Sequence, residues 1–171
     1  VHYITTRMHH RAAWNTYSFS KVFCIPGHRL GAIVCGGRAM AQLQKVMDNL
    51  QICAPRPAQH AVAEALPTLT EWRRNNTTII DERRQAFQTV IEGRDGWSIV
   101  SIGAYFAYLQ HPFPDRDAMD VTRWMAAEHG ILMLPGTCFG DNQQAFVRAA
   151  FANVGVDAIR SLTDRLPVAA A

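Results

Sequence analysis

The stretch that decides the fold reads Ser-Phe-Ser-Lys-Val-Phe-Cys-Ile-Pro-Gly-His-Arg-Leu-Gly over residues 18–31. Before it, the alternating β-forming side chains of residues 14–19 predict a strand. Residues 29–34 predict a second short strand, which their apolar character indicates to be buried. A Pro-Gly dipeptide marks the connection between the two strands. Lys21 is therefore expected where a buried strand ends.

The residue types around Lys21 suit a phosphate ester that also carries a carbonyl group. A buried lysine amine is costly to keep charged, and such an amine is suited to Schiff-base chemistry with a carbonyl compound. Ser18 and Ser20 offer hydroxyl donors, and Arg29 on the next strand offers the fork-shaped cation that a phosphate dianion prefers. The flanking glycines let the backbone approach a bound group closely.

A second candidate residue lies near the C-terminus. The loop over residues 134–140 reads Leu-Pro-Gly-Thr-Cys-Phe-Gly, and the strand pattern over residues 146–152 reads Phe-Val-Arg-Ala-Ala-Phe-Ala. Arg148 is the only charge in that apolar strand, and an arginine in such a place requires a planar anionic partner. The partner is either a ligand or an Asp or Glu of the protein.

Both patterns resemble motifs of the class I/II aminotransferases of pyridoxal-phosphate fold type I. The first is similar to the lysine motif Ser-x-Ser-Lys-(x)7-Arg-x-Gly, and the second to the Pro-Gly-x-x-Phe-Gly loop with the strand after it. The resemblance implies that the cofactor is pyridoxal 5'-phosphate and that Lys21, the catalytic residue, binds it as a Schiff base. It also implies that Ser18 and Arg29 bind the cofactor phosphate, with Ser20 as a lesser contributor. Arg148 would bind the substrate α-carboxylate.

The resemblance extends over nearly the whole chain and implies an α/β fold. Residues 1–66 would form the C-terminal part of the large, cofactor-binding domain, as part of a parallel α/β layer. Residues 67–92 would form a long bridging helix, and residues 93–171 a small α+β domain. Within it, the stretch over residues 103–107 resembles a Gly-aromatic strand of the family, in which Tyr105 and Phe106 would line the substrate mouth or be half-buried in the core. The periodicity predicts further helices over residues 38–50, 58–66, 117–129 and 156–166, and strands over residues 97–100, 104–110, 131–134 and 145–151.

The expected activity is an aminotransferase that moves an amino group between an amino acid and a keto acid. A pyridoxal-phosphate lyase or synthase of the same fold and a non-catalytic C-terminal remnant remain alternatives. The resemblance also implies cofactor-binding residues upstream of the lysine strand, where this sequence has only twenty residues. We therefore expect a missing N-terminal segment, and either a homodimer or association with that segment. His2 and Tyr3 are assigned no role.

Composition excludes several other classes of function. With 49% hydrophobic and 18% charged residues and a net charge of +3, the 171-residue chain is typical of a globular protein. Its arginines are scattered, so no nucleic-acid partner is expected. No apolar run could span a membrane and no signal-peptide pattern is present, so a cytoplasmic location is expected. The adjacent pair His9-His10 lacks a ligand-spaced partner, so no metal site is expected, and the four cysteines are expected to be buried free thiols.

Overall fold

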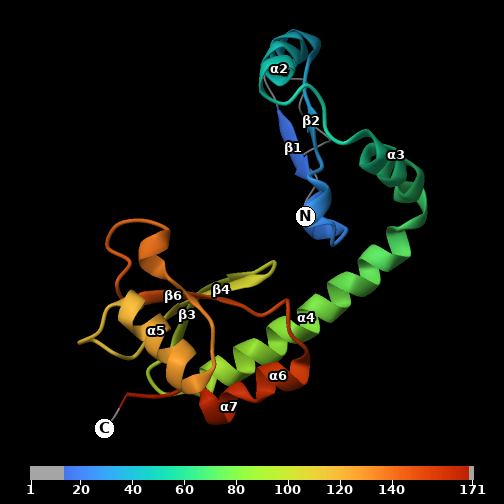
Figure 1. Ribbon diagram of the computed structural model, residues 1–171. Helices are drawn as coiled ribbons and strands as arrows, with labels where there is room; N and C mark the ends of the chain where they lie inside the picture. The colour runs from blue at the N-terminus through green and yellow to red at the C-terminus, as the bar shows by residue number, and fades with distance from the viewer. Residues whose placement is uncertain (1–13, 170–171) are drawn as a thin grey trace. The chain divides into compact units, whose positions relative to one another are not determined.

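The computed structural model describes residues 14–169 of the chain, which fall into two compact units divided between Arg74 and Asn75. One long helix, α4 (Thr70–Glu92), begins in the first unit and continues into the second (Figure 1). The predicted domain boundaries at residues 66 and 92 stay a prediction. The stretches that contain His2, Tyr3 and the His9-His10 pair lie outside the described residues.

The first unit begins with a two-stranded sheet. Strand β1 (Asn15–Ser18) is joined to β2 (Gly31–Val34) through a single helical turn, α1 (Phe19–Val22), and a short 3-10 helix, η1 (Pro26–His28). The strands are antiparallel, so the expected parallel layer is wrong for this pair. A parallel pair needs a connection that crosses over the sheet, whereas the link over residues 19–30 turns the chain back beside β1.

Two helices follow β2 in the first unit, close to where the periodicity predicts them. Helix α2 covers Gly37–Leu50 and α3 covers Arg56–Ala65. The predicted start of the long helix at Pro67 is wrong by a few residues, because Leu66–Thr68 form a separate 3-10 turn, η2, before α4 begins at Thr70. Within residues 14–169, no helix combines the length and the apolar character that crossing a membrane requires.

The second unit is an antiparallel sheet covered by helices. Its strand order is β3-β4-β6-β5, and β4 and β6 are the two central strands. This unit therefore has the small α+β character that the sequence predicts. The strands are β3 (Ser98–Gly103), β4 (Phe106–Gln110), β5 (Leu134–Pro135) and β6 (Phe146–Ala150), and the helical elements after α4 are α5 (Ala118–His129), η3 (Gly136–Cys138), α6 (Val156–Arg160) and α7 (Leu162–Arg165).

Alternation along the two central strands gives the sheet a core face and an open face. Ala107, Leu109, Val147 and Ala149 are buried, and because side chains alternate along a strand, the residues between them point the other way. Arg148 is one of the residues on the open face. The core beneath the sheet joins these side chains to apolar residues of the helices and loops, among them Phe87, Ile91, Val121, Met125, Ile131, Phe151, Ile159 and Leu166.

Arginine side chains fasten the C-terminal segment of the second unit to the rest of it. Arg165 donates to the carbonyl oxygens of His129 and Gly130, both at 2.7 Å, at the C-terminal end of α5. Arg94 donates to the carbonyl of Leu166, and the indole of Trp97 donates to that of Pro167 at 2.7 Å. These bonds satisfy carbonyl groups that have no partner within a helix or strand.

The structure shows no disulfide among the cysteines, all four of which lie in residues 14–169, and the expectation that they are buried is wrong. Cys24, Cys53 and Cys138 are exposed, and Cys35 is half-buried. Cys24, Cys35 and Cys53 lie in connections between elements, and Cys138 ends the short η3 turn in a loop, so none occupies a core-facing position of a long helix or strand.

Candidate functional site

Lys21 lies on the single helical turn that follows β1. Ser18 ends the strand and caps α1, where its Oγ accepts a hydrogen bond from the backbone N–H of Ser20 at 3.3 Å. Lys21 is therefore just beyond the strand rather than at its end. Both Lys21 and the residues of β1 are exposed, so the predicted burial of this lysine is wrong for this chain. Its side chain is at the surface of the first unit.

Arg29 returns toward Ser18 through an unusual backbone conformation. It follows η1 with φ 53°, in the left-handed region, and its Nη1 donates to the carbonyl oxygen of Pro26 at 2.7 Å. Ser18 and Arg29 line the same hollow, about 800 Å³ in volume, between the two strands and α2. Lys21 and the buried Ser20 are not among the described residues that line it.

The donor groups at this hollow suit a phosphate. A serine hydroxyl can accept one hydrogen bond and still donate another, and a guanidinium has five N–H donors, of which the contact with Pro26 uses one. Ser18 is paired with Gly31 across the sheet, where an added Cβ would lie 3.1 Å from the carbonyl oxygen of Tyr17. The close strand contact at Gly31 thus favours glycine where the lysine motif has one.

Arg148 lies at the centre of β6, on the open face of the sheet. Its strand neighbours across the sheet are Tyr108 on β4 and Leu134 on β5. The Cζ atom of Arg148 is 4.4 Å from the ring centroid of Phe106 and 4.2 Å from that of Phe139. The side chain is half-buried, and both contacts are in the range of cation–π interactions.

The alternative of an ion pair within the protein is not seen for Arg148. Within residues 14–169, Arg148 takes part in no ion pair, in contrast to Arg84 with Asp81 and Arg160 with Asp157. Arg148 borders a hollow of about 700 Å³ that Phe106, Tyr108 and Phe139 also line. The arrangement can therefore receive a planar anion such as a carboxylate.

Tyr108 and Gln143 belong to this second hollow, and sequence reasoning missed them. The Tyr108 hydroxyl donates to Oε1 of Gln143 at 2.7 Å, and burial raises the pKa of Tyr108 above its usual value. Tyr108 also stacks on Phe146, with ring centroids 5.6 Å apart. The signal that could have revealed Tyr108 is the alternation of β4, which places it on the same face as Arg148.

The predicted site residues form two groups in different units. Ser18, Ser20, Lys21 and Arg29 belong to the first unit, and Arg148 to the second. Of the two residues proposed for the substrate mouth, Phe106 contacts Arg148, whereas Tyr105 lies in the turn before β4.

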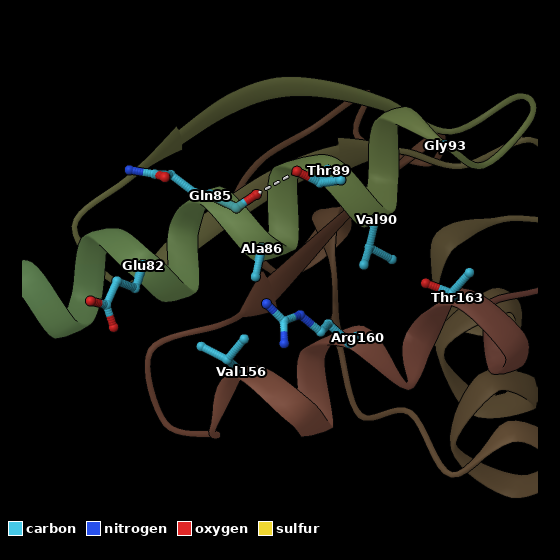
Figure 2. A pocket seen from close by; sticks show the side chains of 9 residues that line it. All are labelled: Glu82, Gln85, Ala86, Thr89, Val90, Gly93, Val156, Arg160 and Thr163. Atoms are coloured by element: carbon cyan, nitrogen blue, oxygen red, sulfur yellow. Dashed lines mark hydrogen bonds between the residues drawn. The ribbon is translucent and has the colours of Figure 1, made fainter.

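A further hollow of the second unit contains none of these residues. It has a volume of about 630 Å³ and lies between α4 and the α6–α7 segment. Figure 2 shows Arg160 reaching from α6 toward α4, where Glu82 and Ala86 are found. The predicted cofactor and substrate residues are elsewhere, so this hollow is not part of the candidate site.

Comparison with known proteins agrees with the fold. The chain is 28% identical over 156 residues to an aromatic aminotransferase of Arabidopsis thaliana, covering 89% of this chain and 39% of that protein. It is 26% identical over 133 residues to a capreomycidine synthase of Streptomyces vinaceus, covering 72% of this chain and 32% of the synthase. A solved aminotransferase from Mycobacterium tuberculosis matches with a TM-score of 0.81 at 24% identity, over 92% of this chain and 41% of that one.

These matches confirm the predicted fold class, an aminotransferase α/β fold present in part. The chain spans about two fifths of the length of the aromatic aminotransferase and of the solved structure. The family described as aminotransferase class I and II matches residues 5–166, which is nearly all of the sequence. The chain belongs to the class I and II aminotransferase family.

Proposed function

We propose that the full-length protein moves an amino group between an amino acid and a keto acid, with pyridoxal 5'-phosphate bound at Lys21. The observation that carries this proposal is the joint placement of Ser18 and Arg29 on one hollow, with Lys21 on the helical turn that Ser18 caps. Family membership supports the same chemistry.

The residues present fit the cofactor that the family implies. The Ser18 hydroxyl and the guanidinium of Arg29 are the short donor and the fork-shaped cation that a phosphate dianion needs. The Lys21 amine, exposed on α1, can condense with an aldehyde. Ser20 is buried, so its part in phosphate binding is the weakest of the four assignments.

Lys21 would have two tasks. Its amine would hold the cofactor, and it would also move the α-proton of the substrate as a general base. When bound, the cofactor supplies an electron sink for the bonds at the substrate Cα. Lys21 therefore determines both whether the cofactor stays attached and how fast the proton moves.

Arg148 would orient the substrate through its α-carboxylate. The absence of an acidic partner within the described residues and the two aromatic contacts support this role. Two parallel N–H···O bonds from a guanidinium set the direction of the carboxylate, and hence of the bonds at Cα.

A synthase or lyase of the same fold is the second candidate. The likeness to a protein named capreomycidine synthase favours it, because that protein matches 72% of this chain at 26% identity, close to the 28% identity of the aromatic aminotransferase. The two candidates share the cofactor and the residues above and differ in what is released.

The partners we propose are amino acid and keto acid substrates and a second chain or chain segment. The first unit exposes several large apolar side chains, which favours their being covered in a homodimer or by an N-terminal segment of the same protein. These exposed residues include Trp14, Ile33, Val34, Leu50 and Ile52.

The cytoplasmic location stays a prediction.

An assay of the full-length protein tests the proposal. With pyridoxal phosphate, a panel of L-amino acids and an α-keto acid acceptor, we expect a new amino acid to form in step with the keto acid of the donor. Release of ammonia without a new amino acid would favour a lyase. Absence of both products across the panel, with cofactor bound, would contradict an aminotransferase.

A further inference from the structure

We propose that Phe106 and Phe139 are positioning residues that hold the guanidinium of Arg148 in the orientation that receives a carboxylate. This inference rests on the proposed role of Arg148 in binding the substrate carboxylate. Neither phenylalanine needs to touch the substrate, because each acts through Arg148.

The two rings reach Arg148 from different parts of the second unit. Phe106 begins β4, the strand beside Arg148, whereas Phe139 follows η3 in the loop between β5 and β6. Their ring centroids are 4.4 Å and 4.2 Å from Cζ of Arg148. A cation–π contact uses the charge of the guanidinium and leaves its N–H groups for hydrogen bonds, so both rings can stay in place when an anion binds.

The two aromatic rings take the place of the acidic side chain that often holds an arginine side chain in one orientation. An arginine side chain has many rotamers, and ordering it when a ligand binds weakens the binding. An acidic neighbour would order the guanidinium but would also occupy its N–H groups, and none lies within ion-pair distance among the described residues. Aromatic rings order the guanidinium without competing for its donors.

The loop that carries Phe139 is itself fixed to the sheet. The backbone N–H of Phe139 bonds to the carbonyl oxygen of Gly136 at 2.8 Å. Gly136 is packed so tightly that an added Cβ would lie 2.6 Å from the hydroxyl oxygen of Tyr108. Tyr108 also contacts the Phe139 ring edge-on, with centroids 6.5 Å apart. Tight packing around Gly136 and the ring contact with Tyr108 thus hold the loop that places Phe139 over Arg148.

The test is a double-mutant cycle on the full-length protein loaded with cofactor. The variants are Phe106→Leu, Phe139→Leu and Phe139→Tyr, each alone and combined with Arg148→Gln. Phe113→Leu is the matched control, because Phe113 is in the same unit and packs on Trp97 and Trp124 rather than on Arg148 or Tyr108. Two dissociation constants are measured, one for the unreactive carboxylate hydrocinnamate and one for its uncharged amide. KM and kcat are measured for amino acids found to be substrates.

We expect Phe106→Leu and Phe139→Leu each to weaken hydrocinnamate binding and raise KM by roughly fivefold, the size of one cation–π contact. Affinity for the amide and kcat should change little. Phe139→Tyr, which keeps a ring, and the control Phe113→Leu should stay near wild type. In the Arg148→Gln background, removing either ring should have no further effect.

Two results overturn the inference in different ways. In the first, Arg148→Gln weakens hydrocinnamate binding, but the ring variants either leave that binding unchanged or weaken it just as much in the Arg148→Gln background. The rings then do not act through Arg148, and the proposed role of Arg148 stands. If Arg148→Gln leaves hydrocinnamate binding unchanged, the proposed role of Arg148 is wrong, and so is the positioning role that depends on it.

Discussion

The hydroxyl of Tyr108 donates to Oε1 of Gln143 at 2.7 Å, and this bond joins β4 to the loop that leads into β6. Gln143 is fixed in turn, because its Nε2 donates to the carbonyl oxygen of Asp141 at 3.2 Å. The phenol is partly buried on the open face of the sheet beside Arg148, its strand partner on β6. The uncharged form of Tyr108 is therefore a structural element of the second hollow.

The first prediction concerns the ionisation of Tyr108. Burial raises the pKa of Tyr108 above its usual value, because the phenolate is less well solvated in the fold. The stability that this group contributes is complete below the usual pKa and is lost as the pH rises through the raised one. In an alkaline titration of tyrosinate absorbance, Tyr108→Phe should remove a late-ionising group, whereas Tyr17→Phe should leave that group in place. A late step that survives Tyr108→Phe would contradict this assignment.

The second prediction separates Lys21 from the other lysine of the chain. In the full-length protein, Lys21→Ala should abolish the visible absorbance of covalently bound cofactor. Lys45→Ala should not, because Lys45 is exposed on α2, where its Nζ donates to Oε1 of Gln42 at 3.5 Å and no phosphate-binding group is near it in sequence. An absorption spectrum of each purified variant is the measurement. Normal cofactor colour in Lys21→Ala would contradict the role of Lys21.

The third prediction separates the two arginines. Arg148→Lys should weaken amino-acid binding by about 2 kcal/mol and leave cofactor affinity unchanged, because a lysine cannot form two parallel bonds to a carboxylate. Arg29→Ala should weaken cofactor binding before amino-acid binding, since Arg29 lines the hollow with Ser18. Cofactor titration and substrate KM measure the two effects. Equal loss of cofactor in both variants would mean that one arginine is misassigned.

The fourth prediction concerns the loop that carries Phe139. In Gly136→Ala the added Cβ would lie within 2.7 Å of three atoms, two of them backbone carbonyl oxygens, so the loop must move. We expect a loss of about 1–3 kcal/mol of stability, typical of an overpacked site. Gly103→Ala is the control, because nothing lies within 4 Å of its Cβ. Thermal unfolding measures the difference, and equal midpoints for the two variants would contradict this account of Gly136.

Sequence reasoning succeeded where the signal is local and periodic. Helix α4, predicted over residues 67–92, is observed at Thr70–Glu92, and the alternation of residues 146–150 places Arg148 opposite the core. The lysine motif likewise brings Ser18 and Arg29 together, because the short connection folds β2 back beside β1.

Sequence reasoning failed where burial or a contact depends on distant parts of the chain. The β-forming side chains of residues 14–19 predict a strand but do not specify what covers it, so the exposure of Lys21 was not foreseen. The contact of Phe139 with Arg148 depends on how a loop lies over a strand, which no periodicity encodes. The antiparallel pairing of β1 with β2 follows from the geometry of the connection rather than from strand propensity.

The last prediction concerns the 171-residue chain produced by itself. Leu50, Ile52, Val34 and Trp14 are 79%, 77%, 64% and 54% exposed, an apolar surface that water disfavours. We expect this chain to sediment with a mass above its own 19.1 kDa, by pairing with itself or with an added N-terminal segment. It should bind pyridoxal phosphate weakly, because Lys21 can condense with the aldehyde while other residues of the family's cofactor site are supplied elsewhere. Replacing Leu50 and Ile52 by glutamate should reduce the association, whereas glutamate at the exposed Gln59 of α3 should not. A monomer that binds the cofactor tightly and transaminates would contradict both expectations.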